Sequence, residues 1–396
     1  MKVVNNMKTE ISPRERVNLS LNHTTPDRVP VDFLATVEVW EKMIAFLGME
    51  APGPFNTGFF DENWEALLQK YQVDCRLLSY DQFFQPPDSF FEKGDTIDWW
   101  DALSRSTPNR MFRRVSKDGD IFDLWGHHMR VVKNPTGAYE EIVQFPLRDA
   151  SPSDVQNYTW PKPDWWDFSS LPEVIAQLDT HESYHLRFRA GSIFEVAWQL
   201  CGMDKFLMDL ALDPQVPLLI MDHLTEITAE LLNRVLEENS ERLDMVYFYD
   251  DVATENSLMI SKDMWKQYIQ PRHARLFEVA KKYNKKIMYH CDGSIYPLIP
   301  DLIEMGVDLL NPVQVDANNM EDWRLKDEFG DMLCFHGGID NIHTLPCGTP
   351  QEVQKEVKDR IHVLGKNGGY IVTSTHHIQS NTPPENVNAM YDINIR

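Results

Sequence analysis

The chain has 396 residues and a formal net charge of −23 at pH 7, with 42% hydrophobic and 25% charged residues. This composition is typical of a soluble globular protein, and no apolar run approaches the roughly 18 residues that a membrane-spanning helix needs. Because an acidic surface repels phosphate groups at long range, we expect neither nucleic acid nor an anionic membrane as a partner.

The first residues and the cysteines indicate the cellular compartment. Residues 1–8 contain no apolar core or cleavage site of a secretion signal, so we expect a cytoplasmic location. The five cysteines are scattered and form no CxxC motif, which indicates reduced thiols rather than a disulfide framework.

The first third of the chain is aromatic and irregular in pattern. Residues 26–33 are predicted to form a first strand, and residues 38–48 have the 3.6-residue periodicity of a helix that ends at a glycine. From about residue 55 to residue 166 the pattern breaks into short strands and turns with recurrent tryptophans. We interpret this range as an aromatic-rich cap or insertion over the mouth of the fold.

From about residue 185 short apolar strands alternate with helices. Strands are predicted at 186–190, 245–249, 287–289, 307–310, 332–335 and 370–373. Helices are predicted at 194–212, 217–238, 264–283, 297–305, 320–328 and 350–364. This alternation indicates an α/β fold with a parallel sheet and right-handed crossovers. Polar residues follow nearly every strand, which favours a closed (β/α)8 TIM barrel, and we expect residues 1–396 to form a single domain.

These polar residues are the candidates for an active site at the carboxyl ends of the strands. In chain order they are Glu195, Asp250, Asp251, His290, Asp292, Asn311, His336, His376 and His377. Two acids at one strand end share a proton or need a cation, so Asp250 and Asp251 are candidate catalytic groups, although a structural cap on the next loop is the alternative. Glu195 is a candidate acid or additional metal ligand. We expect Asn311, His336 and His377 to contact the substrate, although His377 could be only a neighbour of a ligand.

Several motifs resemble the uroporphyrinogen decarboxylase-like superfamily from about Ser12 to the C-terminus. They lie at residues 12–16, 26–31, 249–251, 290–295, 337–340 and 382–386. The decarboxylases carry an Arg-Gln-Ala-Gly-Arg segment after the first strand, whereas residues 34–38 read Leu-Ala-Thr-Val-Glu here. The chain therefore looks like the branch of corrinoid-dependent methyltransferases rather than the decarboxylases themselves.

The resemblance implies a zinc site. The methyltransferase relatives bind zinc through a His-x-Cys pair and a distant cysteine, and these positions correspond to His290, Asp292 and His376. Two histidines and a carboxylate leave an open position for substrate, and such hard ligands suit polarising an oxygen better than holding a thiol. Asp292 before Gly293 could instead be a turn aspartate. Cys291 should point away, since neighbouring residues on a strand face opposite sides.

The function that follows is an O-demethylase-type methyl transfer. The metal would bind the oxygen of a methoxylated or otherwise methylated small molecule, and a cob(I)alamin on a separate corrinoid protein would take the methyl group. The tryptophans and phenylalanines of the cap are compatible with an aromatic donor. Two alternatives stay open, a metal-free decarboxylase or lyase acting on a small acid and a binding protein on a barrel scaffold. The donor, the metal and a homodimer are also left open.

Overall fold

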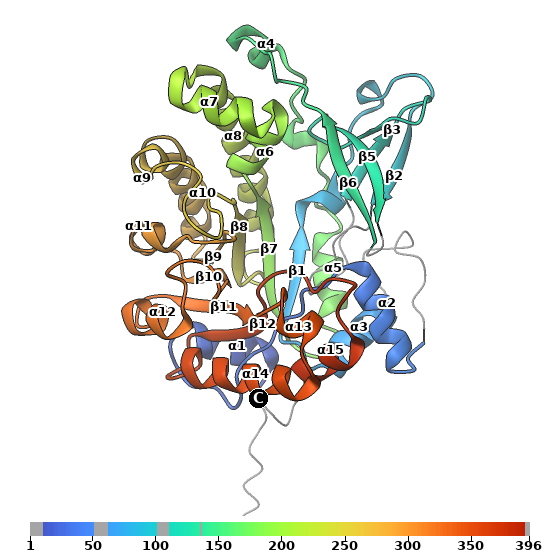
Figure 1. Cartoon of the computed structure of the whole chain (residues 1–396). Coiled ribbons are helices and arrows are strands. Elements are labelled where there is room, and N and C mark those ends of the chain that lie inside the picture. The colour runs from blue at the N-terminus through green and yellow to red at the C-terminus, as the bar shows by residue number, and fades with distance from the viewer. Residues whose placement is uncertain (1–10, 51–61, 101–110, 135–136, 393–396) are drawn as a thin grey trace, which may run out of the picture.

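The computed structural model describes residues 11–50, 62–100, 111–134 and 137–392. A curled sheet of seven parallel strands lies at the centre (Figure 1). In spatial order the strands are β1 (Cys75–Ser79), β7 (His185–Gly191), β8 (Met245–Tyr249), β9 (Lys286–His290), β10 (Leu309–Val313), β11 (Cys334–Ile339) and β12 (Tyr370–Ser374). The α/β fold and the strands predicted from residue 185 onward are confirmed.

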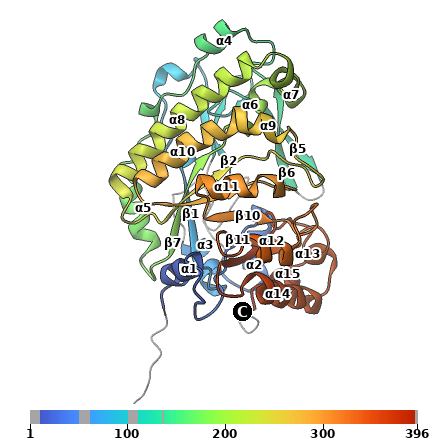
Figure 2. The same cartoon turned by 90° about the vertical axis from the view of Figure 1, so that its left-hand side faces the viewer.

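Helices follow the strands and cover the outside of the sheet, as Figures 1 and 2 show. Those between β7 and β9 are α6 (Phe194–Cys201), α7 (Met203–Leu212), α8 (Gln215–Asn239), α9 (Lys262–Met264) and α10 (Gln270–Lys282). After β9 come α11 (Ile299–Met305), α12 (Asp322–Phe329), α13 (Thr344–Cys347), α14 (Pro350–Leu364) and α15 (Pro384–Met390). The helix predicted over 194–212 is interrupted at Gly202, which has a φ of 84° and joins α6 to α7. A π-helical turn at Trp265–Ile269 precedes α10.

Alternate residues of each strand face two different cores, as the two-residue period of a strand requires. One core, which includes Leu77, Tyr247, Met288 and Ile371, fills the inside of the curled sheet. Val17 and Leu21 pack against it, and both belong to α1 (Pro13–Leu21). The residues between these positions, such as Phe248, pack outward against the helices.

The segment at residues 30–36 lies between β12 and β1, the two edges of the sheet. Val31 forms an isolated parallel bridge with Val372 of β12, and Ala35 forms another with Ile378. On the other side the Asp74 amide donates to the Val31 carbonyl at 3.0 Å. The regular strand predicted over 26–33 is therefore wrong, because this segment fills the eighth position through single bridges. Figure 1 shows α2 (Val37–Phe46) and α3 (Glu62–Lys70) beyond this position.

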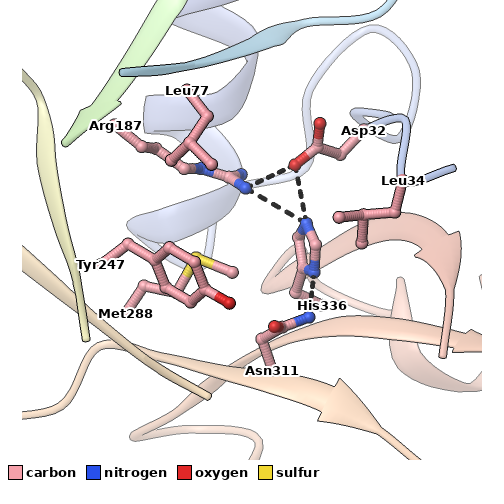
Figure 3. Close-up of a pocket in the computed structure, with 8 residues that line it drawn as sticks. All are labelled: Asp32, Leu34, Leu77, Arg187, Tyr247, Met288, Asn311 and His336. Atoms are coloured by element: carbon pink, nitrogen blue, oxygen red, sulfur yellow. Dashed lines mark hydrogen bonds and ion pairs between the residues drawn. The ribbon is translucent and has the colours of Figure 1, made fainter. Parts of the chain in front are cut away.

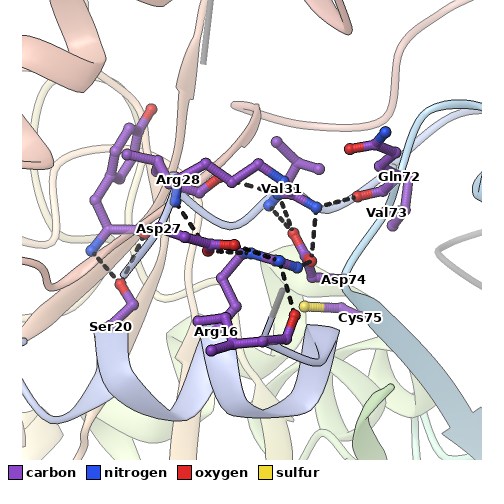
Figure 4. Close-up of polar contacts among 12 residues, drawn as sticks. Arg16, Ser20, Asp27, Arg28, Val31, Gln72, Val73, Asp74 and Cys75 are labelled. Atoms are coloured by element: carbon purple, nitrogen blue, oxygen red, sulfur yellow. Dashed lines mark hydrogen bonds and ion pairs between the residues drawn. The ribbon is translucent and has the colours of Figure 1, made fainter. Parts of the chain in front are cut away.

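A buried carboxylate holds this segment in place (Figure 4). Asp74 is fully buried and directly precedes β1. One of its oxygens accepts from Arg16 Nη1 at 2.7 Å, and the other accepts from Arg28 Nη1 at 2.7 Å and from the Val31 amide at 2.8 Å. Arg16 in turn binds Asp27 through two contacts of 2.6 and 2.8 Å. Because every group in this cluster is paired, two arginines can lie against the interior.

The range predicted as a cap contains two kinds of structure. β1 lies within it and belongs to the main sheet, so the predicted boundaries need correction. The rest includes an antiparallel sheet of β2 (Thr96–Trp100), β3 (Met111–Val115), β4 (Ile121–Phe122), β5 (His128–Asn134) and β6 (Gly137–Gln144), followed by α4 (Pro152–Asn157). The next helix, α5 (Leu171–Leu178), lies beyond the end of the range. Tyr139 on β6 donates to Gln379 Oε1 after β12 at 3.0 Å. Its role as a cover over the mouth stays a prediction, and residues 55–61, 101–110 and 135–136 of this range lie outside the described residues.

None of the helices in the described ranges combines the length and the apolar character needed to cross a membrane.

Replacing Asp74 tests how far the closure of the sheet depends on this carboxylate. We expect Asp74→Asn to lower the free energy of unfolding by about 3–5 kcal/mol, because it leaves two arginines without their shared partner. The matched control is Asp27→Asn, whose side chain is 38% exposed and whose loss should cost about 1 kcal/mol. Urea unfolding measures both, and equal losses would contradict the special role of Asp74.

A second prediction concerns acid sensitivity. His185 on β7 is fully buried, and burial lowers its pKa to about 4. Between pH 6.5 and pH 4 the unfolded chain takes up a proton here that the folded protein does not, so stability should fall as the pH falls through this window. We expect His185→Leu to remove about 3 kcal/mol of this pH-dependent loss by pH 4. Unfolding measured at pH 7, 5.5 and 4 checks this, and an unchanged slope would contradict it.

Candidate active site and metal centre

A pocket of about 320 Å³ opens at the carboxyl ends of five neighbouring strands, β8 to β12. The residues that line it are Ala253, Thr254, Glu255, Asp292, Gly293, Gln314, Asn341, Ile342, Thr375 and His376, and we call it the rim pocket. Each belongs to a loop that follows one of these strands. This is the face at which barrels of this class place their active sites, and the volume suits a small molecule.

Three of the predicted site residues meet at the inner side of this pocket. His290 ends β9, Asp292 follows it, and His376 follows β12. Each offers a ligand atom, and these three atoms lie within 4.8 Å of one another. Asp292 Oδ1 lies 3.7 Å from His290 Nε2, and Asp292 Oδ2 lies 3.6 Å from His376 Nε2. We call these residues the candidate metal group.

The turn after β9 is held from both sides. The Asp292 amide donates to Asp251 Oδ1 at 2.8 Å, and the Gly293 amide donates to Gln314 Oε1 at 2.9 Å. Gly293 has a φ of 81°, and a Cβ at this position would lie 2.4 Å from the Thr254 carbonyl oxygen. Only glycine fits such a close approach, so the loop after β8 determines where Asp292 lies.

The donors of the candidate metal group fit a divalent metal ion. Ligand atoms around a tetrahedral zinc ion lie about 3.3 Å apart, given metal–ligand bonds of about 2.0–2.1 Å. The contacts of 3.6 and 3.7 Å, which run from the two histidines to the two different oxygens of Asp292, are each within a few tenths of an ångström of that value. One ligand atom from each residue lies within 4.8 Å of the other two. Asp292 Oδ1 is buried and has no hydrogen-bond donor among the described residues. A cation at this point would satisfy it.

The charge around this position is negative. Asp251 Oδ1 lies 3.8 Å from His290 Nε2, beside Asp292. Burial raises the pKa of Asp251, and the Asp292 carboxylate raises it further, whereas His290 lowers it. Within the described ranges the ion-pair contacts of Asp292 are with the two histidines alone. Two carboxylates without a lysine or arginine partner favour a bound cation.

On its other side His290 contacts Asn311, which belongs to a buried cluster with His336, Asp32 and Arg187 in the barrel interior (Figure 3 shows these four). Its Nδ1 lies 2.6 Å from Asn311 Oδ1, and Asn311 Nδ2 lies 2.6 Å from His336 Nδ1. His336 Nε2 is 2.9 Å from Asp32 Oδ2, which also accepts from Arg187 Nη1 at 2.6 Å. Burial lowers the pKa of His336 to about 4, so its ring is neutral at pH 7.

The substrate contacts expected of Asn311, His336 and His377 are not supported. Asn311 and His336 are 3% and 1% exposed, and they line a small cavity with a volume of about 20 Å³. That space holds about one water molecule and no substrate. His377 is buried next to His376 and does not line the rim pocket. Cys291, as expected, points away into the outer core.

The acids predicted as catalytic groups separate into different roles. Asp250 is fully buried and accepts from Ser192 Oγ, from the amides of Ile193 and Glu195 at 3.0 and 2.9 Å, and from His273 Nε2 at 2.6 Å. It therefore anchors the start of α6, which follows β7, rather than the loop after β8 that the structural alternative named, and the catalytic role of Asp250 stays a prediction. Asp251 adjoins the candidate metal group. Glu195 is half-buried and is not a member of that group, so its role stays a prediction.

Sequence reasoning missed two sets of residues. Gln314 and Asn341 line the rim pocket, and both lie shortly after predicted strands, where a polar residue was the available signal. Asp32 and Arg187 are ionised and lie inside the barrel. Arg187 lies between Leu186 and Phe188 on one strand, so the alternation of side chains could have predicted that Arg187 points to the inner face. Nothing local indicated that Asp32 would be its partner.

Comparisons with known proteins give consistent findings. The family model described as uroporphyrinogen decarboxylase (URO-D) matches residues 140–394. A curated relative, the methylated-thiol–coenzyme M methyltransferase of Methanosarcina mazei, is 23% identical over 254 residues, which are 62% of this chain and 63% of the relative. The match thus spans less than two thirds of that relative. A solved structure of a methyltransferase from Methanosarcina mazei has a TM-score of 0.61 and 18% identity over 96% of this chain and 97% of the other, which shows a shared fold.

The two neighbouring aspartates should respond differently to the same substitution. Asp250→Asn is expected to lower the free energy of unfolding by about 2–4 kcal/mol, because an amide nitrogen would face donors that now meet a carboxylate. Asp251→Asn keeps an acceptor for the Asp292 amide and should change stability by less than about 1 kcal/mol. Thermal unfolding of both variants measures this, and the reverse order would show that the roles are misassigned.

Proposed function

Because the chain belongs to the uroporphyrinogen decarboxylase (URO-D) family, whose model matches residues 140–394, we propose that it is a metal-dependent methyltransferase acting with a corrinoid protein. The curated relative and the solved structure from Methanosarcina mazei are both methyltransferases, which supports methyl transfer in general. The observation that carries the proposal is the candidate metal group, whose three ligand atoms lie within 4.8 Å of one another beside the rim pocket.

His290, Asp292 and His376 would hold the metal, for which we propose zinc. Three protein ligands leave a fourth position that faces the substrate, as catalytic zinc sites require. When bound, the ion supplies a Lewis acid that withdraws electron density from the substrate heteroatom and makes it a better leaving group. Asp251 accepts from the Asp292 amide and so keeps this ligand in place.

The methyl donor is proposed to be a methoxylated or otherwise heteroatom-methylated small molecule. The candidate metal group has nitrogen and oxygen donors and no thiolate, and such a set favours an oxygen over a sulfur ligand. This differs from the methylated thiol in the name of the curated relative. The lining of the rim pocket is mostly polar, and His376 is its only aromatic side chain among the described residues. A small polar donor therefore fits this pocket better than an aromatic ether.

In the proposed reaction, polar side chains orient the donor while its methyl group faces the open mouth. Thr254, Gln314 and Asn341 present hydroxyl and amide groups to the rim pocket for this purpose. The carbon–oxygen bond breaks, its electron pair stays with the oxygen, and a proton is taken up there. The corrinoid protein would supply a cob(I)alamin nucleophile, whose electron pair would form the new bond to the methyl carbon. A corrinoid partner docking over this mouth, a cytoplasmic location and a homodimer remain predictions.

The metal assignment predicts about one zinc ion per chain in the purified protein. His290→Ala and His376→Ala should each lose this metal, because two ligands bind zinc far more weakly than three. His343→Ala is the control, since His343 lies on the same rim with 74% of its side chain exposed and is not a member of the group. Elemental analysis by mass spectrometry measures the content. Stoichiometric zinc in both ligand variants would exclude this site.

The activity is tested with free cob(I)alamin as the methyl acceptor and a series of methoxylated and N-methylated compounds under anaerobic conditions. We expect methylcobalamin, followed by its absorbance, with at least one donor and a rate about 100-fold lower in His290→Ala. The His343→Ala control should keep the normal rate. Methyl transfer that survives zinc removal would contradict the metal-dependent mechanism. Decarboxylation of a small acid by metal-free protein would instead establish the alternative of a metal-free decarboxylase or lyase.

A further inference from the structure

We propose that a buried network of four side chains fixes the protonation of His290, so that its Nε2 lone pair always faces Asp292. The members are Asn311, His336, Asp32 and Arg187, and we call them the interior network (Figure 3). They are positioning residues, since none of them lines the rim pocket. The inference rests on the proposed metal-binding role of His290, but its test uses protein without metal.

The order of hydrogen-bond donors and acceptors in the interior network starts from Arg187. This side chain is 2% exposed and donates to Asp32 Oδ2 at 2.6 Å and to Cys75 Sγ at 2.9 Å. A guanidinium is always charged and can only donate. Asp32 is equally buried, so the paired arginine keeps it ionised and able only to accept.

This carboxylate determines the tautomer of His336. Its Oδ2 lies 2.9 Å from His336 Nε2, and a lone pair on that nitrogen would face an anionic oxygen. Nε2 must therefore carry the hydrogen. Arg187 Nη1 is 3.1 Å from the same nitrogen, which is compatible with two donors that converge on one oxygen. Because the ring is neutral, its Nδ1 is left as an acceptor.

Asn311 links the tautomer of His336 to the tautomer of His290. An acceptor at His336 Nδ1 requires the amide nitrogen of Asn311, which lies 2.6 Å from it. The amide oxygen then faces His290 Nδ1 at 2.6 Å and requires a hydrogen there. A neutral His290 with Nδ1–H has its lone pair on Nε2, the atom that points toward Asp292 and Asp251.

The opposite arrangement would place the hydrogen on the other nitrogen of each ring. If His336 carried its hydrogen on Nδ1, the amide of Asn311 would turn over and His290 would be protonated on Nε2. That nitrogen could not bind a metal without first losing its proton. The Asp32 carboxylate disfavours this arrangement, because a lone pair on His336 Nε2 would face an anionic oxygen at 2.9 Å and would be offset only by the longer 3.1 Å contact with Arg187 Nη1.

The test is the tautomer of both rings in metal-free protein, observed by long-range ¹H–¹⁵N NMR with labelled histidine at pH 8.5. The histidine signals are assigned with His290→Gln and His336→Gln. We expect hydrogen on Nδ1 of His290 and on Nε2 of His336. Hydrogen on Nε2 of His290 in the wild-type protein would overturn the inference, whatever the variants do.

Two substitutions at Asn311 separate positioning from a general structural role. In Asn311→Leu the Nδ1–H of His290 has no acceptor, so the Nε2–H tautomer should appear and zinc affinity, measured by chelator competition, should fall about 10–100-fold. In Asn311→Asp the carboxylate still accepts from His290, so its tautomer should persist while His336 gains a second proton. The control is Asn239→Leu, at a buried asparagine at the end of α8 whose side-chain amide donates to the Val235 carbonyl.

The outcomes distinguish this inference from the proposed function. If zinc binds to His290 but Asn311→Leu keeps the wild-type tautomer and affinity, the inference is wrong and the metal site stands. If no zinc binds while the tautomers are as expected, the interior network is supported and the metal-dependent function is excluded.

Discussion

The closure of the curled sheet is the constraint on which the rest of the structure depends. Residues 30–36 fill the gap between β12 and β1 with single bridges, so backbone pairing alone holds this seam weakly. Two buried carboxylates reinforce it, Asp74 beside β1 and Asp32 on the seam itself. Asp32 also belongs to the interior network that ends at His290. Asp32 thus contributes both to the closure of the sheet and to the orientation of a candidate metal ligand.

Much of the fold follows from local pattern in the sequence. Residues 245–249 and 350–364 form β8 and α14 with the predicted bounds, because each has a clear apolar period and a clear end signal. The segment at 26–33 reads like a strand but lies at a seam where regular pairing is absent. β1 was assigned to the cap because it stands alone between irregular stretches. Its place in the sheet depends on pairing with β7, more than 100 residues away.

The candidate site shows the same division. His290, Asp292 and His376 were predicted from their places after strands and from the family resemblance, and the structure brings them together. Asn311 and His336 lie within β10 and β11 and face the barrel interior, whereas Asp250 follows β8 and bonds to the surrounding helices α6 and α10. Asn311 and His336 take part in a network with Asp32, which lies 304 residues before His336. Position after a strand indicates nearness to the site, whereas only tertiary contacts separate a ligand from a residue that orients it.

The proposed metal site consists of nitrogen and oxygen ligands only. X-ray absorption at the zinc edge of the purified protein would report the ligand atoms around the metal. We predict a shell of nitrogen and oxygen atoms at about 2.0–2.1 Å with two imidazoles and no sulfur. A sulfur ligand at about 2.3 Å would contradict the account, because it would mean that a cysteine outside the candidate metal group binds the metal.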